Sequence, residues 1–271
     1  MKRALSLAVL ATALLVVTGS AAGAGPSPGI TFGSPGVLSH DGKLRYVALR
    51  AGRGTLVESI TTRGGVVRHS RFLRGVYGVP LVAYDGTRGG LSRDGKRLVV
   101  YSPAAGAAQP ATRFAVLDPR SLRVRKQVAL WGDFGFDALS PDGSLLYLIQ
   151  LKGDSGNYDV RALNLDTGRL YPGAIVDRRE PDEKMTGIPL TRVGSGDSSW
   201  AYTLYTRPSK SPFVHALHTT QRQAFCIDVP LPVSDDDLAR VRMRMGADKL
   251  LVRMAGKTLA TIDTRTLKVR R

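Results

Sequence analysis

Short apolar runs alternate with polar turns along this chain, and the alternation repeats about every fifty residues. Each run is rich in leucine, valine and aromatic side chains and follows an aspartate in a polar turn. These aspartates stand 53, 48, 55 and 51 residues apart. The five runs are residues 46–49, 98–101, 145–148, 200–202 and 250–252. Short β-prone runs at a regular spacing, separated by turn residues, predict an all-β fold built from repeated units.

The turn before each run has the form Ser-x-Asp-Gly in three copies and is degraded in the other two. The intact copies are residues 39–42, 92–95 and 140–143, and the degraded copies are residues 195–198 and 246–249. Aspartate and serine side chains bond the backbone amides of a turn, and glycine supplies a positive φ. We therefore interpret the aspartates as turn caps, and not as a ring of ligands.

A second turn marker follows each aspartate after 15 to 24 residues, at 60–62, 117–119, 163–165, 217–219 and 262–264. Most copies carry an Asp, Asn or Thr in a tight turn, after which the chain pairs back. Two hairpins per repeat predict about five four-stranded blades of a β-propeller over residues 25–271, as a single domain. Little chain follows the last marker, so we expect residues 29–32 to supply the missing outer strand and the termini to close the ring.

The N-terminus has the pattern of a secretory signal. Lys2 and Arg3 precede an apolar run over residues 4–17, and Ala22-Gly23-Ala24 forms a cleavage site of small residues. The run is shorter than the roughly 20 residues of a spanning helix, which makes an uncleaved anchor the weaker alternative. We predict a signal peptide over residues 1–24, a secreted or extracytoplasmic location, and no transmembrane helix after cleavage.

The chain is strongly basic, with a formal net charge of +17, or +15 without Lys2 and Arg3. Six arginines concentrate in the first repeat, at positions 50, 53, 63, 68, 71 and 74. Such a charge favours anionic binding partners, namely envelope polymers, acidic lipid headgroups or extracellular nucleic acid. A solvated surface is the alternative. Aromatic residues make up only 7% of the chain, and no pattern suited to base stacking appears.

Two features invite a catalytic interpretation. Cys226 is the one cysteine, so no intramolecular disulfide can form, and its apolar neighbours predict a buried, unreactive thiol. Gly153-Asp154-Ser155-Gly156 resembles the nucleophile loop of chymotrypsin-type proteases. Asn157 stands where those proteases have a further glycine, and no histidine lies in a comparable upstream motif. We interpret the loop as a hairpin turn of the third repeat.

Metal binding has weak candidates only. Asp154, Asn157 and Asp159 offer oxygen donors for calcium, but their spacing breaks the pattern of a calcium loop. The acidic cluster 235–237 is best interpreted as a solvated loop. The four histidines are His40, His69, His215 and His218, and no pair has the spacing of a zinc motif.

Two segments just before repeat turns are the best candidates for a ligand site. Trp131-Gly132-Asp133-Phe134-Gly135-Phe136-Asp137 places aromatics beside two carboxylates at the entry to an innermost strand. Tyr77, Tyr84 and Asp85 occupy the similar stretch before the second repeat. The alternative is that the aromatics pack between blades and the carboxylates cap turns. We assign no catalytic, cofactor-binding or metal-binding residue, and no cofactor.

The repeated turns, taken together, resemble those of the WD-repeat-like propellers of bacterial envelopes, including the YVTN-type and Tol-system-like groups. The resemblance covers residues about 30–271, although five copies are fewer than the six or seven usual there. It implies an exported monomer that acts as a non-catalytic binding or scaffold module for a protein or an anionic envelope polymer. Two alternatives are a propeller enzyme of the lactonase or quinoprotein type and a purely electrostatic binder of an anionic polymer.

Overall fold

Antiparallel strands make up almost all the regular structure of the computed structural model, which describes residues 25–153, 156–207 and 210–271. The predicted signal peptide and two loop residues, Asp154 and Ser155, lie outside the described residues. One short helix, α1 (Asp235–Leu238), is present in the described part. The predicted all-β fold is confirmed.

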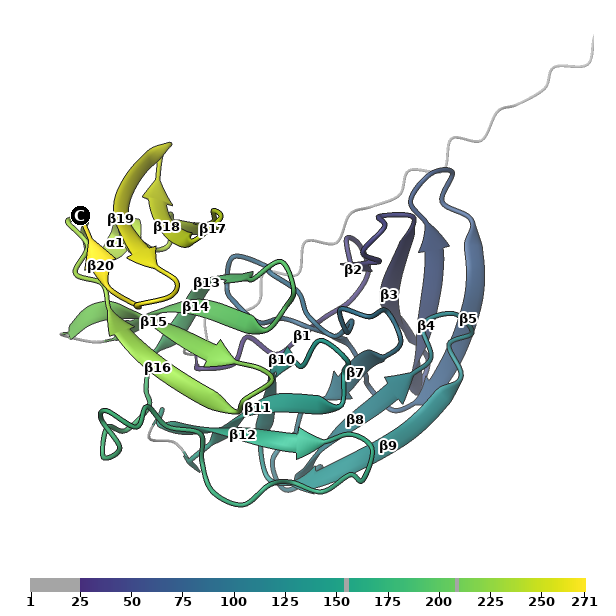
Figure 1. The fold of residues 1–271 in the computed structure, drawn as a ribbon. Helices are drawn as coiled ribbons and strands as arrows, with labels where there is room; N and C mark the ends of the chain where they lie inside the picture. Colours follow the sequence, from purple (N-terminus) through teal and green to yellow (C-terminus); the bar gives the residue numbers. More distant parts are fainter. Residues whose placement is uncertain (1–24, 154–155, 208–209) are drawn as a thin grey trace, which may run out of the picture.

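Five larger sheets follow one another round an arc, one sheet for each sequence repeat (Figure 1). We number them in chain order and give their strands from the inner to the outer edge. Sheet 1 contains β2 (Val37–Leu38), β3 (Leu44–Ala51), β4 (Gly54–Thr61) and β5 (Val67–Arg74); sheet 2 contains β7 (Leu98–Ser102), β8 (Ala111–Leu117) and β9 (Val124–Trp131); sheet 3 contains β10 (Phe134–Leu139), β11 (Leu145–Leu151) and β12 (Tyr158–Asn164); sheet 4 contains β13 (Ile188–Gly194), β14 (Trp200–Arg207), β15 (Lys210–His218) and β16 (Gln223–Asp228); sheet 5 contains β17 (Arg242–Met245), β18 (Lys249–Met254), β19 (Lys257–Asp263) and β20 (Val269–Arg270).

The hydrophobic core consists of four clusters, each of which lies between two successive sheets. Neighbouring residues of one strand point to opposite faces, so a buried strand serves two clusters. In β7, Val99 packs against sheet 3 while Val100 packs against sheet 1. Because both faces of such a strand are buried, the central strands are apolar at nearly every position.

The ends of the arc do not meet as we expected. No cluster of buried apolar residues joins sheets 1 and 5 in the part of the chain that the structure describes, and the two sheets lie at opposite ends of the arc (Figure 1). Residues 29–32 do not complete the last sheet, because β1 (Ile30–Thr31) pairs with β6 (Val79–Pro80). Ile30 packs on the core between sheets 2 and 3, and Val269 of β20 packs on the core of sheets 4 and 5. The apolar side chain of each terminal segment therefore packs on a different core cluster, and the two segments do not pair with each other.

Sheet 2 sends a segment across the middle of the molecule. Its inner edge is made by isolated pairings of Gly78 with Tyr101 and of Leu91 with Leu98. Residues 79–90 lie between Gly78 and Leu91, and we call this segment the central insertion. The backbone amides of Tyr84 and Asp85 donate to carbonyl oxygens of residues 189 and 190 in β13, at 2.9 and 3.0 Å. The insertion thus ties sheet 2 to sheet 4 across the centre.

Glycine allows the central insertion to lie close to sheet 3. A Cβ at Gly89 would come within 2.6 Å of a ring carbon of Phe136, closer than real Cβ contacts. The insertion is also held as a hairpin, because the amide of Val82 donates to the carbonyl of Thr87 at 2.9 Å. The backbone of the central insertion therefore runs through the centre of the arc.

Sheet 3 ends in an irregular segment, residues 170–187, which we call the rim segment. The amides of Tyr171 and Ile175 donate to carbonyl oxygens of β12, so the segment begins as a partial fourth strand. It then leaves sheet 3, and Asp177 pairs with Ala224 of β16 on sheet 4. The rim segment therefore bridges the outer edges of two neighbouring sheets.

Candidate functional site

The aspartates of four repeat turns are structural. Asp41, Asp94, Asp142 and Asp197 each accept a hydrogen bond of 2.6 Å from the serine hydroxyl two residues earlier. Each also accepts one of 3.0–3.1 Å from the amide two residues later. These bonds, with the Ser195 hydroxyl first, lower the pKa of Asp197 to about 2. The prediction that the aspartates cap turns is confirmed for these four copies.

The fifth copy is different. Asp248 pairs with Arg265 at 3.2 Å, across the surface of sheet 5. The degraded sequence thus corresponds to a changed turn, and the five aspartates do not share one chemical role.

The side chains of the candidate segment 131–137 are divided between the core, the surface and an ion pair. Phe134 and Phe136 are buried in the core between sheets 2 and 3. Trp131 is 81% exposed and belongs to β9, the outer strand of sheet 2. Asp137 is only 2% exposed and forms an ion pair with Arg192 of β13. For Phe134 and Phe136, the alternative interpretation of the sequence is therefore correct, since these aromatic side chains pack between two blades.

Arg192 is fixed on every side. Its guanidinium donates to the backbone carbonyl and side chain of Asp137, and its Nε donates to Thr203 Oγ1 at 2.7 Å. The pair lies between sheets 3 and 4, with both side chains less than 10% exposed. It joins two inner strands that are 55 residues apart in sequence.

The three residues before the second repeat are also separated. Tyr77 is buried between sheets 1 and 2. The exposed Tyr84 hydroxyl lies 3.0 Å from the amide of Gly25, and the Asp85 side chain accepts hydrogen bonds from the amide and hydroxyl of Thr87. Both Tyr84 and Asp85 hold the central insertion in place.

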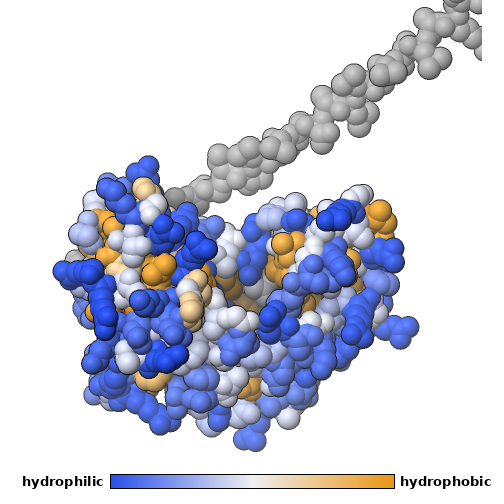
Figure 2. Space-filling view, turned by 45° about the horizontal axis from the view of Figure 1, so that its top comes forward, coloured by the Kyte–Doolittle hydropathy of each residue, from blue (hydrophilic) through white to orange (hydrophobic). Residues whose placement is uncertain are grey.

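The central insertion separates two adjoining cavities, which we call the central hollow. One, of about 300 Å³, lies between the insertion, β10 and β13; the other, of about 480 Å³, lies between the insertion and β2. Thr87, Arg88, Gly89 and Leu91 line both. Figure 2 shows the molecule hollowed between the two ends of the arc. The open side of the arc lies between sheets 1 and 5.

Guanidinium groups dominate the polar lining of the central hollow. Arg45, Arg88, Arg93 and Arg192 line it, and Asp137 is the one carboxylate among the lining residues described. Arg192 already neutralises Asp137. Arg45 and Arg88 bond backbone carbonyl oxygens of residues 35 and 86, and neither is joined to a carboxylate in the described part of the chain. The hollow consequently has an excess of positive charge and free N–H donors.

Sheet 5 continues this positive surface at the open end of the arc. Met243 and Met245 point into the core of sheets 4 and 5, so the alternation of the strand places Arg242 and Arg244 on the opposite face. Arg253 lies directly opposite Arg242 in the sheet. The open face of sheet 5 is therefore rich in arginine.

Sheet 1 presents a different face to the gap. Leu38 and Phe72 are about half exposed on the side away from sheet 2, where Leu56 pairs with Phe72. Arg45 pairs with Leu38 in the sheet and so lies on the same face, which therefore combines apolar and basic side chains. Of the six arginines expected to concentrate here, Arg71 donates to the carbonyl of Leu122, and Arg50 lies 4.8 Å from the ring centroid of Phe32.

The remaining sequence candidates have structural roles. Burial raises the pKa of the Cys226 thiol to about 12, and its Sγ lies 3.6 Å from Met185 Sδ, so the thiol stays protonated. The acidic residues 235–237 form α1, which Ser234 caps. His40 Nε2 lies 2.9 Å from the carbonyl oxygen of Ser92, and His218 Nδ1 lies 3.1 Å from the hydroxyl of Thr220.

No group of three or more His, Cys, Asp and Glu side chains in the described ranges is arranged to hold a metal ion. The proposed calcium loop and the protease-like loop include Asp154 and Ser155, which lie outside those ranges. Among the described residues, no helix has the length and apolar content required to cross a membrane.

The sequence interpretation missed the arginines of the central hollow. Arg45, Arg88 and Arg93 come from two repeats and a loop, with no shared spacing. The position of Arg93 inside the second Ser-x-Asp-Gly turn was the one available signal, since that turn lies at the inner end of a strand.

The radial order of the sheets, each antiparallel from an inner to an outer strand, defines the class of β-propellers, as the repeated turns led us to expect. No protein-family model matches the chain, and no curated protein matches it in sequence.

Several solved structures are similar to the chain. A functionally unknown protein from Desulfotomaculum acetoxidans DSM 771 has a TM-score of 0.54 at 10% identity, over 86% of this chain and 67% of that one. The Swd1 β-propeller domain of Myceliophteria thermophila has a TM-score of 0.48 at 11% identity, over 88% and 67%. TolB from Acinetobacter baumannii has a TM-score of 0.43 at 16% identity, over 83% of this chain and 51% of TolB. At these identities the likeness concerns the fold alone.

Proposed function

We propose that this chain is an exported, non-catalytic β-propeller of five blades, open between the first and fifth, that binds an anionic partner in its central hollow. The observation that carries the proposal is the lining of that hollow, where Arg45, Arg88 and Arg93 face the cavities without carboxylate partners among the described residues. Guanidinium groups bind carboxylate, sulfate and phosphate oxygens through paired N–H donors.

The gap and the overall charge support the same function. An elongated polymer can enter an open arc from the side, and the arginine-rich face of sheet 5 extends the positive surface beyond the hollow. The net charge of +15 without Lys2 and Arg3 attracts polyanions over a distance. We therefore prefer an anionic envelope polymer to a protein as the partner, and the N-terminal signal pattern supports export.

A propeller enzyme of the lactonase or quinoprotein type is the less favoured function. Such chemistry requires carboxylates and histidines that converge at one mouth of the propeller. In the central hollow, Asp137 is held by Arg192, and the ring of His40 bonds a backbone carbonyl of the next sheet. The available groups are donors for an anion and favour binding.

Binding to dextran sulfate tests this function, with neutral dextran of the same length as the control. We expect binding to dextran sulfate alone, with an affinity that falls steeply as salt rises. The double variant Arg88→Gln/Arg93→Gln should bind at least tenfold more weakly, because each lost charge-assisted contact contributes about 1.5–3 kcal/mol.

The matched control is Arg63→Gln/Arg68→Gln, which removes the same charge from exposed positions of sheet 1. This pair should weaken binding by less than threefold through the general field. Equal losses in the two double variants, or an affinity that does not change with salt, would contradict a site in the central hollow. Unfolding curves of both variants establish that the fold is retained.

A further inference from the structure

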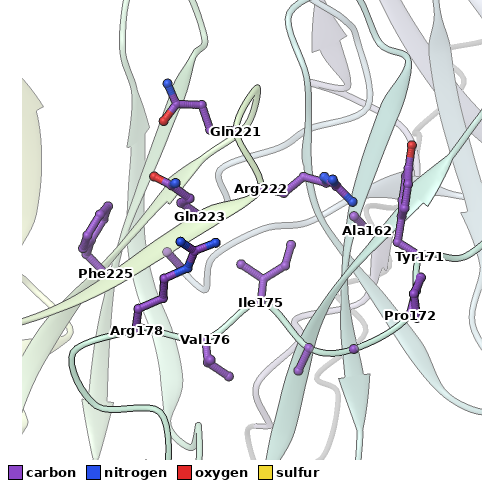
Figure 3. Close-up of a pocket in the computed structure, with 13 residues that line it drawn as sticks. Ala162, Tyr171, Pro172, Ile175, Val176, Arg178, Gln221, Arg222, Gln223 and Phe225 are labelled. Carbon is purple, nitrogen blue, oxygen red and sulfur yellow. The ribbon is translucent and has the colours of Figure 1, made fainter.

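A further cavity, of about 410 Å³, opens at the outer edges of sheets 3 and 4, away from the inner strands that line the central hollow. It exists because the rim segment leaves β12 after Ile175 and crosses to β16, where Asp177 pairs with Ala224. A regular fourth strand would have filled this space by staying beside β12. We call the cavity the rim groove (Figure 3).

One wall of the rim groove is rigidly anchored. Asp177 is 4% exposed, accepts a hydrogen bond of 2.8 Å from the amide of Cys226, and is bonded by two nitrogens of the Arg179 guanidinium. That guanidinium also donates to the carbonyl of Cys226 at 3.1 Å. Burial alone would raise the pKa of Asp177, but these donors together hold it below its ordinary value, so the anchor stays charged at neutral pH. A groove with a fixed wall binds a ligand at a lower entropic cost.

The polar side chains of the rim groove are donors or neutral amides. Arg178, Gln221, Arg222 and Gln223 line it, and no carboxylate belongs to the lining. Arg222 is occupied, since its guanidinium lies 4.3 Å from the ring centroid of Tyr171. Figure 3 shows Arg178 extending toward Gln223, with Ile175 and Val176 beside it. Arg178 is exposed and forms no ion pair in the described part of the chain, which leaves its guanidinium free to bind a ligand.

The three kinds of lining group define a class of ligand. A guanidinium pairs with a carboxylate through two parallel hydrogen bonds. A glutamine amide both donates and accepts, which suits hydroxyl groups. The apolar side chains of Ile175 and Val176 offer a surface to the face of a small ring, whereas the ring of Phe225 is already covered by the Arg179 guanidinium, 5.2 Å from its centroid. The volume lies within the usual range for a small-molecule site, roughly 300–1,000 Å³.

We propose that the rim groove binds a small hydroxylated carboxylic acid, of which a hexuronic acid is the simplest ring-shaped example. Arg178 binds the carboxylate, Gln223 binds ring hydroxyls, and the face of the ring lies on Ile175 and Val176. This site is separate from the central hollow and does not depend on the function proposed for it. A neutral hexose lacks the charge, and inorganic phosphate lacks both the ring and the apolar face.

Isothermal titration calorimetry of the protein with glucuronate, glucose and inorganic phosphate tests the proposal. We expect glucuronate to bind with a dissociation constant at least tenfold lower than that of glucose or phosphate. Arg178→Gln should weaken glucuronate binding about tenfold, and Gln223→Leu should weaken it severalfold. The control Arg169→Gln changes a nearby exposed arginine outside the groove and should leave the affinity unchanged.

The proposal would be overturned by the absence of any heat of binding with glucuronate at millimolar concentration, by equal binding of glucose, or by an unchanged affinity in Arg178→Gln. Phosphate bound as tightly as glucuronate would show a nonspecific anion site and would overturn it as well. Dextran sulfate binding by Arg178→Gln should equal that of the unmodified protein, so the two sites are tested separately. Loss of glucuronate binding in Arg88→Gln/Arg93→Gln, with Arg178 intact, would place the ligand in the central hollow instead.

Discussion

Replacement of Arg192 by leucine is expected to lower the free energy of unfolding by about 3–5 kcal/mol, because it leaves the Asp137 carboxylate buried without its partner. Both side chains are less than 10% exposed, and the second carboxylate oxygen, Oδ2, has no hydrogen-bond partner. The lost guanidinium also bonded Thr203 of the same sheet. Equilibrium denaturation in urea, followed by near-ultraviolet circular dichroism, measures the effect.

Two further variants separate the buried charge from other causes. Arg192→Leu/Asp137→Leu removes both charges and should recover most of the loss, since a pair of apolar side chains carries no desolvation penalty. Arg265→Leu breaks the exposed pair with Asp248 and should cost under about 1 kcal/mol. A loss under 1 kcal/mol in Arg192→Leu itself would mean that water reaches Asp137.

Acidification from pH 7 to pH 4 should destabilise the protein by up to about 3 kcal/mol through His215 alone. Burial is the main cause that lowers the pKa of His215 to about 4, and within that net value Asp137 opposes the shift while Arg192 adds to it. The unfolded chain binds a proton near pH 6.5, but the folded chain does not until about pH 4. Stability from this group is therefore complete above pH 6.5 and is lost as the pH falls toward 4, at 1.36 kcal/mol per pH unit.

His215→Phe is the variant that tests this pH dependence. The side chain is 1% exposed and both ring nitrogens lack hydrogen-bond partners, so a phenyl ring removes two unsatisfied polar atoms. We expect unfolding free energies at pH 8 to equal or exceed those of the unmodified protein, and the fall between pH 6.5 and 4 to be much smaller. His69→Gln, at an exposed position, should leave the pH profile unchanged. An identical fall in His215→Phe would assign the pH dependence to carboxylates.

The sequence predicted the parts of the fold that depend on near neighbours. In the Ser-x-Asp turns the side chains form hydrogen bonds between residues two positions apart, such as Ser140 and Asp142. Four consecutive residues are therefore enough to predict the geometry of the turn. The apolar runs likewise predict strands, because both faces of strands such as β7 are buried. These signals gave the all-β class and the number of repeats.

The contacts that shape the site are long-range and carried no local signal. Arg192 meets Asp137 across 55 residues, and Tyr84 reaches β13 from the central insertion. The pairing of Ile30 with Pro80 could not be distinguished from a pairing with the last sheet, because both offer an unpaired strand edge to a short apolar segment. Residues with no common spacing, such as Arg45 and Arg88, meet in one hollow only after these contacts form.

The four core clusters have an energetic consequence for the open arc. Sheets 2, 3 and 4 are each buried on two sides, whereas sheets 1 and 5 are each buried on one. Apart from the hydrogen bonds by which the central insertion joins sheet 2 to sheet 4, stability is then a sum over nearest-neighbour interfaces, as in a linear repeat protein with two ends. Sheet 5 can detach by breaking a single interface while the other three interfaces persist. Unfolding can therefore begin locally at an end of the arc, whereas in a closed ring every sheet has two interfaces to break. Sheet 1, at the other end, is likewise held by a single interface, so both end blades separate more readily than the three blades between them.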